Sequence, residues 1–437
     1  MVSALRPFAA RILTRPYCRR HLLVGASAAL SVGAPLDLAR CIRAKIATTG
    51  PISVAEYMQL CNGAARWGYY SGAEETREIV GADGDFVTSP ELSQVVGEVL
   101  AAWLTCELAR LGHQGRVQLV ELGPGTGALC ADLLRTLPAL GWKDVADRLS
   151  LHLVDISPSL RRRQRDRLCA ATEDDESAPS DGVERRTTLG CPVSWHSDLA
   201  QVPAAFSVFI ANEFLDALPI HQFRLESGHW REVLVDAAAD GQGFALCLAP
   251  GETAHSRTLL PQLLSARRAC GQSEFVDGDV LEVSPQSAAV LRQLSARLVG
   301  HGGSALLIDY GHVGDRRTSS LRAYSQHEHA DPLCRPGEVD MTADVDFGYL
   351  ASQLRGSAPL AVHGPVSQAS FLRRLAAEQR FDKLISRCST QEQRRYVEHC
   401  RRTLLGENEM GERFKAMTLS CPRTDSAPLG FDTESDQ

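Results

Sequence analysis

The chain has 437 residues, of which 44% are hydrophobic and 23% are charged. These values are ordinary for a globular protein, and the length allows two or three domains or one large α/β domain with additions. No apolar run approaches the roughly 20 residues of a membrane span, so we expect no transmembrane segment. The formal net charge of −7 disfavours general binding to nucleic acids and suits a cationic partner.

Cysteine spacing argues against two further classes of protein. The 13 cysteines are scattered along the chain, and no two of them have the C-x₂₋₄-C spacing of common zinc sites. A disulfide framework is also unexpected in a chain of this length. We therefore predict no metal site and a reducing compartment.

The first 36 residues differ in composition from the rest of the chain. They contain five arginines, and the first acidic residue is Asp37. A basic, acid-poor segment that can form an amphipathic helix is typical of a mitochondrial transit peptide, although an exposed basic tail has the same composition. Its removal would take the net charge from −7 to −12, so the remaining body is more strongly acidic.

Residues 37–112 are predicted to form a helical N-terminal cover. Ser53 and Glu56 have the spacing of a capping box, which begins a helix. Ser89 and Pro90 are N-cap and first-turn signals for a second helix. The apolar residues of this second helix recur at helical spacing: Leu92, Val95, Val96, Val99, Leu100, Trp103 and Leu104.

The loop before the second helix contains candidate ligand contacts. Asp85, Thr88 and Ser89 lie at or just before the helix N-terminus, where free N–H groups can meet a carboxylate of a ligand. A loop that only caps the helix is an equally good interpretation.

The most informative segment is a predicted strand, Val117–Leu122, followed by a glycine turn and a helix. Gly123, Gly125 and Gly127 lack the Cβ that would keep a ligand away from the backbone, and Thr126 lies among them. The helix points its free N–H groups at the turn, as in the nucleotide sites of doubly wound α/β sheets. The glycines also match the dinucleotide fingerprint, which is a weak pattern on its own.

Two acidic residues favour S-adenosylmethionine (SAM) over NAD as the ligand. Glu121 precedes the first glycine by two residues, where a carboxylate repels a pyrophosphate but attracts the ammonium and sulfonium groups of SAM. Asp155 ends the next predicted strand, Leu151–Val154, and is placed to accept hydrogen bonds from ribose hydroxyls. It lies 28 residues after Gly127, against the ~20 residues expected of the dinucleotide fingerprint. A turn that serves only chain reversal fits this order of acid, turn, helix and second acid less well.

Strands and helices alternate through the rest of the chain. Residues 206–211 and 304–309 are predicted as buried strands, and 221–248 as antiparallel strands. Helices are expected to begin at Ser157 and Ser284. The first of these helices carries a cluster of arginines, to which we assign no function.

The predicted fold class is α/β, a class I, Rossmann-like sheet with an N-terminal helical cover and inserted and C-terminal additions. In chain order we expect a transit peptide at 1–36, the cover at 37–112, the core at 113–350 with a flexible insertion at 172–190, a C-terminal addition at 351–418 and a disordered tail at 419–437.

Polar residues end four of the predicted strands: Glu121, Asp155, the pair Asn212-Glu213 and the pair Asp309-Tyr310. In an open α/β sheet, ligands bind outside the carboxyl ends of the strands. We therefore expect these side chains along one edge, with Asn212 on the cofactor side.

Glu213 and Asp216 are candidates for binding a cationic substrate. In a helical turn they share one face. Paired carboxylates beside a methyl donor can bind a guanidinium through bidentate hydrogen bonds and stabilise the proton that it must lose. A capped turn, in which Asn212 and Asp216 satisfy backbone groups, is the alternative.

The segment that ends the later buried strand contains three more candidates. Asp309 is a third carboxylate that could hold the cationic substrate. Tyr310 and His312 carry a hydroxyl and an imidazole, which are suited to proton movement or to orienting a nucleophile. A single histidine near a loop is equally often structural.

Several segments occur in the order found in one known family: Gly50–Tyr57, Gly68–Tyr70, Gly84–Ser93, Glu121–Gly127, Asn212–Pro219 with His221–Phe223, Asp309–His312 and Met410–Lys415. Together they resemble the MidA-type mitochondrial SAM-dependent protein arginine methyltransferases, which are assembly factors of respiratory complex I. The resemblance covers about residues 50–417, and the set as a whole is specific.

The resemblance implies SAM as the cofactor and symmetric dimethylation of an arginine on a core subunit of complex I in the mitochondrial matrix. Asp155 departs from the family pattern, in which Glu is expected there, but the shorter acid should still reach a ribose. A non-catalytic assembly chaperone that keeps the fold, and an NAD-dependent enzyme, are the alternatives.

Overall fold

The computed structural model describes residues 37–72, 87–170, 177–241, 243–354, 359–422, 424 and 426–432. The predicted transit peptide at 1–36 and the candidate ligand contact Asp85 lie outside these described residues.

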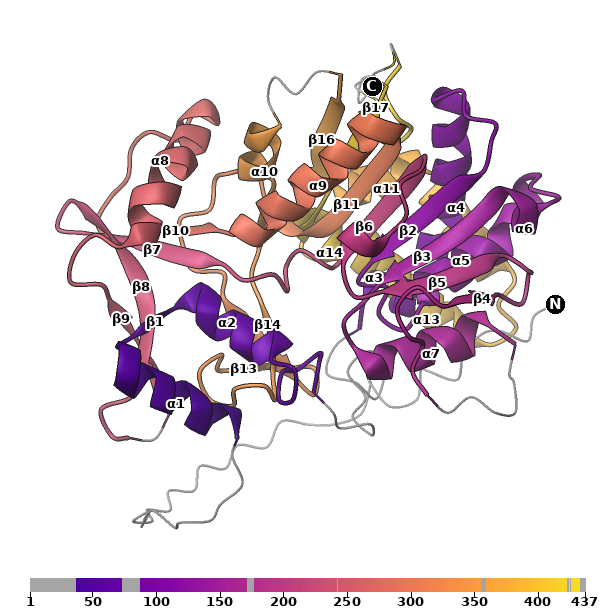
Figure 1. Ribbon diagram of the computed structural model, residues 1–437. Coiled ribbons are helices and arrows are strands. Elements are labelled where there is room, and N and C mark those ends of the chain that lie inside the picture. The colour runs from indigo at the N-terminus through magenta and orange to yellow at the C-terminus, as the bar shows by residue number, and fades with distance from the viewer. Residues whose placement is uncertain are drawn as a thin grey trace.

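The fold is built on a central, mostly parallel sheet (Figure 1). Across the sheet, the strands follow the order β16 (Ala361–Ser367), β17 (Phe414–Cys421), β11 (Gly303–His312), β6 (Ser207–Asn212), β2 (Val117–Leu122), β3 (Leu149–Val154), β5 (Pro192–His196) and β4 (Glu184–Arg186). The strands from β11 to β5 are parallel, β17 is antiparallel to β11 and to β16, and β4 is antiparallel to β5. The two-residue strand β15 (Val345–Asp346) pairs with the end of β11. The predicted Rossmann-like α/β class is confirmed.

Helices cover both faces of this sheet because successive residues of its strands point to opposite sides. In β2, Leu119 packs into one hydrophobic core and Val120 into another. The first core includes side chains of α4 (Gln94–Arg110), α5 (Ala128–Thr136), α11 (Gln368–Arg374), α12 (Ala377–Ser386) and α13 (Gln391–Leu405). The second includes side chains of α8 (Ala254–Ala269), α9 (Pro285–His301) and α10 (Phe347–Gln353). The shorter helices α6 (Val145–Arg148) and α14 (Met410–Arg413) precede β3 and β17.

A second lobe lies beside the central sheet, at the left of Figure 1. Its antiparallel sheet contains β1 (Ile52–Ser53), β8 (His229–Ala237), β7 (His221–Glu226), β10 (Val280–Val283) and β9 (Phe244–Leu248). The helices α1 (Leu38–Thr49) and α2 (Val54–Gly63) share a hydrophobic core with it. The same core reaches the small sheet of β12 (Arg322–Ser325), β13 (Glu328–Ala330) and β14 (Asp340–Thr342).

Two predictions about residues 37–112 need correction. The helix expected after Ser89 is split into α3 (Ser89–Leu92) and α4, because Ser93 is extended, with φ −152°, and its side chain caps α4. The segment is also not a single cover: α1 and α2 pack in the second lobe, whereas α4 packs in the core of the central sheet.

The predicted insertion and C-terminal segments also differ from expectation. Within the insertion at 172–190, β4 pairs with β5 and extends the central sheet. The region 351–418 is not an external addition, because β16 and β17 complete that sheet. The tail prediction is wrong where it begins: β17 runs to Cys421, and the buried Phe431 packs against Phe371 of α11 with ring centroids 5.2 Å apart. Among the described residues, no helix is both long and apolar enough to cross a membrane.

The docking of Phe431 leads to a test of the C-terminal segment. Phe431→Ala removes a buried ring from the hydrophobic core that contains α11. We therefore expect the free energy of unfolding to fall by about 3 kcal/mol in urea denaturation. Val276→Ala is the matched control, because Val276 is 66% exposed and should change stability by less than ~0.5 kcal/mol. Equal stabilities of the two variants would contradict this packing.

Candidate functional site

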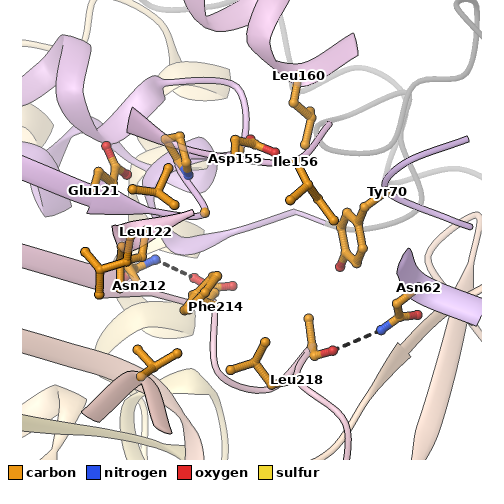
Figure 2. Close-up of a pocket in the computed structure, with 18 of the residues that line it drawn as sticks. Asn62, Tyr70, Glu121, Leu122, Asp155, Ile156, Leu160, Asn212, Phe214 and Leu218 are labelled. Atoms are coloured by element: carbon orange, nitrogen blue, oxygen red, sulfur yellow. Dashed lines mark hydrogen bonds between the residues drawn. The ribbon is translucent and has the colours of Figure 1, made fainter. Parts of the chain in front are cut away.

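A cavity of about 480 Å³ lies where the strand order reverses, between β2 and β6. Its wall contains the ends of β2, β3 and β6 on one side and residues of α2 on the other. Figure 2 shows these walls facing each other across the cavity. This is the position at which doubly wound sheets bind their ligands, so the central sheet and the second lobe together enclose the candidate site.

The three glycines after β2 have different physical roles. All three have positive φ, with +65° at Gly123, +53° at Gly125 and +78° at Gly127. A Cβ at Gly123 would lie 2.8 Å from the Phe214 ring, so this glycine permits close packing of the loop. A Cβ at Gly125 would have nothing within 4 Å, so this glycine leaves space in the cavity wall. Gly127 is the N-cap of α5 and faces Gln164 rather than the cavity.

Gln164 links the glycine loop to the acid that ends β3, and the sequence analysis missed it. It lies in α7 (Pro158–Leu168), and its Nε2 donates to the Gly125 carbonyl at 2.8 Å and to Asp155 Oδ2 at 2.7 Å. Its Oε1 accepts from the Trp195 ring at 2.9 Å. Gln164 therefore positions both Gly125 and Asp155. In the sequence, the only indication of this role is that Gln164 lies in the helix that follows Asp155.

Two arginines of the α7 cluster, to which the sequence analysis assigned no function, have structural roles. Arg161 is buried and bonds to the Asp155 carbonyl and to Asp181. Arg167 donates to Glu91 at 2.7 Å and also bonds to Thr126, whose hydroxyl donates to the same Glu91 carboxylate. These contacts fix the positions of Asp155 and of the glycine loop.

Glu121 and Asp155, the predicted SAM contacts, both line the cavity, and both are buried. Burial raises the pKa of Glu121 to about 7, although the Cys130 thiol, 2.7 Å from its carboxylate, opposes this. Burial also raises the pKa of Asp155 to about 6, against hydrogen bonds from the Ser157 N–H and Gln164. Buried carboxylates are costly to ionise unless a positive charge lies beside them, so this part of the cavity favours a cationic ligand.

Asn212 and Glu213, at the end of β6, also line the cavity. The Asn212 amide donates to Glu213 Oε1 at 3.2 Å (Figure 2), and the Ser89 N–H donates to the same oxygen at 2.7 Å. Asn212 Oδ1 is buried and has no hydrogen-bond partner among the described residues. Burial raises the pKa of Glu213 to about 7. A buried acceptor without a partner favours a ligand that brings a donor.

Asp309 holds the turn after β6 instead of facing the cavity. It is wholly buried, and its Oδ2 accepts the backbone N–H groups of Phe214, Leu215 and Asp216 at 2.8–3.2 Å. Burial and the nearby Asp216 and Glu213 carboxylates raise the pKa of Asp309 well above its ordinary value. The prediction that Asp309 and Asp216 contact the substrate is therefore not supported, because neither lines the cavity.

The remaining predicted residues divide between the cavity and other places. Thr88 and Thr126 line it, whereas Ser89 acts through its N–H on Glu213. Tyr310 and His312 line a separate cavity of about 270 Å³ beside Arg413. The end of β11 extends beyond the main cavity, where Gly311 and His312 pair with β15. The imidazole of His312 is buried and accepts the Gly314 N–H at 3.1 Å.

Comparisons with known proteins identify the family. The model of a family of S-adenosyl-L-methionine-dependent methyltransferases matches residues 99–366. The chain belongs to this family. It is 40% identical over 377 residues to "Protein arginine methyltransferase NDUFAF7 homolog, mitochondrial" of Caenorhabditis elegans, covering 86% of this chain and 84% of the relative. It is 37% identical over 389 residues to the NDUFAF7 protein of Mus musculus, covering 86% and 82%.

A solved structure gives the same result for the ligand. The protein from Burkholderia thailandensis crystallised with S-adenosyl-homocysteine has a TM-score of 0.72 at 28% identity, covering 92% of this chain and 95% of that chain. SAM as the cofactor is thus confirmed over NAD, and the mitochondrial location agrees with the relatives' names. The open wall at Gly125 and the acceptors on Glu121, Asp155 and Asn212 fit this ligand.

Gly125 permits a test that separates binding from folding. Because a Cβ there meets no protein atom within 4 Å, Gly125→Ala should cost only the strain of its positive φ, about 1 kcal/mol. It should nevertheless weaken SAM binding by at least tenfold in calorimetry. The added methyl group would occupy open space at the cavity wall that the bound ligand needs. Gly123→Ala is the comparison: it should lower the melting temperature more, because its Cβ meets Phe214. Unchanged SAM affinity in Gly125→Ala would argue against this position of the ligand.

The raised carboxylate pKa values predict how stability depends on pH. The folded pKa of Glu213, about 7, exceeds its ordinary 4.5. The folded protein therefore binds more protons than the unfolded chain between these values, and its free energy of unfolding falls as the pH rises through about 7. In urea denaturation of the ligand-free protein at pH 4.5 and 8, Glu213→Gln should reduce this fall by up to ~3 kcal/mol. The exposed Glu226, changed to Gln, is the control and should leave the fall unchanged.

Proposed function

We propose that the protein transfers methyl groups from SAM to an arginine of a protein substrate. The observation that carries this proposal is a pair of buried acceptors in the cavity wall: the Glu213 carboxylate and the unpartnered Asn62 Oδ1. A guanidinium has five N–H donors in a planar fork and stays protonated in water, so it matches a pocket of carboxylate and amide oxygens. The relatives' names as protein arginine methyltransferases support this assignment.

The chemistry needs an aligned nitrogen and a place for one proton. Bound SAM supplies the electrophilic methyl group. Glu213 holds an N–H of the guanidinium and takes up the proton that leaves as the nitrogen–carbon bond forms and the carbon–sulfur bond breaks. Its pKa of about 7 suits a general base near neutral pH. The apolar side chains of Phe214, Leu218 and Ile156 in the wall limit the entry of water (Figure 2).

The far end of the cavity is suited to the substrate rather than to the cofactor. There, the Asn62 amide nitrogen donates to the Ala217 carbonyl at 3.1 Å (Figure 2). It also donates to the Met341 carbonyl at 2.9 Å, and the two bonds fix the side chain. Asn62 Oδ1 is buried and has no hydrogen-bond partner among the described residues. Nearby, Tyr70 lines the same cavity and donates to Asp340 at 2.6 Å. We assign Asn62 Oδ1 to an N–H donor of the substrate.

The finer activity follows from the resemblance described above. We propose symmetric dimethylation of an arginine on a core subunit of mitochondrial complex I, in the matrix, as a step in complex I assembly. The acidic chain, with a net charge of −7, is compatible with a cationic segment as the substrate.

The test joins an enzyme assay to a cellular one. In cells that lack the protein, the wild type should restore symmetric dimethylarginine on a complex I core subunit in mass spectrometry, whereas Glu213→Gln should restore less than a tenth of it. The purified Glu213→Gln protein should still bind SAM, and Asn62→Leu should raise KM for the protein substrate several-fold at an unchanged SAM affinity. Complex I assembly restored by Glu213→Gln without methylation would favour the non-catalytic chaperone.

A further inference from the structure

Two histidines and a glutamate converge in the second lobe, outside the cavity. His221 is the first residue of β7, Glu232 lies in β8, and His255 lies in the first turn of α8. The Nδ1 atoms of both imidazoles face one carboxylate oxygen, Glu232 Oε1, at 2.9 Å from His221 and 3.0 Å from His255. One nitrogen or oxygen atom from each of the three side chains lies within 4.8 Å of the others.

Among the described residues, no arginine or lysine forms an ion pair with Glu232. The Glu232 side chain is 1% exposed, and within the described ranges its ion pairs are with the two histidines. The two imidazole rings have their centroids 4.2 Å apart. The Thr253 hydroxyl also donates a hydrogen bond to the Glu232 carboxylate.

We propose that His221, Glu232 and His255 bind one zinc ion. Imidazole and carboxylate are ligands that Zn²⁺ prefers, and three protein ligands with a water in the fourth position is a common arrangement. Ligand atoms about 2.1 Å from a tetrahedral ion lie roughly 3.4 Å apart. The separations of 2.9 and 3.0 Å between the imidazole nitrogens and Glu232 Oε1 are a few tenths of an ångström shorter than this. The ligand atoms of the two histidines lie within 4.8 Å of each other.

The surroundings of the cluster allow entry and indicate the role of the ion. The His255 side chain is 50% exposed, so the ion can reach the site from solvent. The ligands come from the hairpin of β7 and β8 and from the N-terminal turn of α8, so the ion fastens the helix to the hairpin. None of the three ligands lines the main cavity. The site is therefore separate from the methyl transfer proposed above.

The experiment measures zinc binding to the full chain after treatment with a chelator. Calorimetry with ZnCl₂ should give one site per chain in the wild type and none in His255→Ala. His255 is the ligand to change, because its half-exposed ring adds little to the core and the variant should fold. His229→Ala is the matched control: His229 is exposed, lies at the start of β8 and is outside the cluster, so the variant should bind zinc as the wild type does.

Two further measurements separate this site from the cysteines and from the methyltransferase site. With Co²⁺, nitrogen and oxygen ligands give weak visible bands, whereas thiolate ligands add strong near-ultraviolet absorption, which we expect to be absent. Zinc should raise the melting temperature of the wild type and of His229→Ala but not of His255→Ala, with equal SAM affinity in all three. Equal zinc binding by the wild type and His255→Ala, or no effect of zinc on wild-type melting, would falsify the proposal and leave a hydrogen-bonded cluster.

Discussion

The carboxylate of Asp309, at the end of β11, holds the turn on which the site is built. Three consecutive backbone N–H groups after β6 donate to its Oδ2, in an environment without solvent exposure. This turn carries Glu213 at φ +53°, a conformation that non-glycine residues seldom adopt. It also places Phe214 against Gly123. One buried acid thus connects the end of β11, the proposed base and the glycine loop.

The site places three buried carboxyl groups around one cavity, and this determines its ligands. Burial raises the pKa of Glu121, Asp155 and Glu213 above the ordinary values of carboxyl groups. Each carboxyl is costly to ionise without a partner, and a cation that enters the cavity supplies one. SAM carries a sulfonium and an ammonium group, and arginine carries a guanidinium. The same electrostatic environment therefore suits both the cofactor and the proposed substrate.

The chemical type of a side chain predicted membership of the site less well than its position in the fold. Tyr310 and His312 have the side chains of proton-transfer catalysts, yet they line a different cavity. Gln164, which has no chemistry of its own to attract notice, joins Gly125 to Asp155. The position of a strand end can be predicted from the sequence. How far β11 extends beyond the ends of its neighbours in the central sheet depends, however, on its pairing with β15. That pairing has no local sequence signal.

The strand, glycine turn and helix of the cofactor site, and the acids Glu121 and Asp155, could be predicted from the sequence because each depends on neighbours close in the chain. The alternation of buried strands and helices likewise predicted the α/β class. The opposite wall could not be predicted in this way, because there Asn62 bonds to Ala217 and Met341 from far along the chain. The same holds for the cluster of His221, Glu232 and His255, which three separate elements bring together. Contacts of this kind depend on how the elements pack, and packing depends on the whole chain.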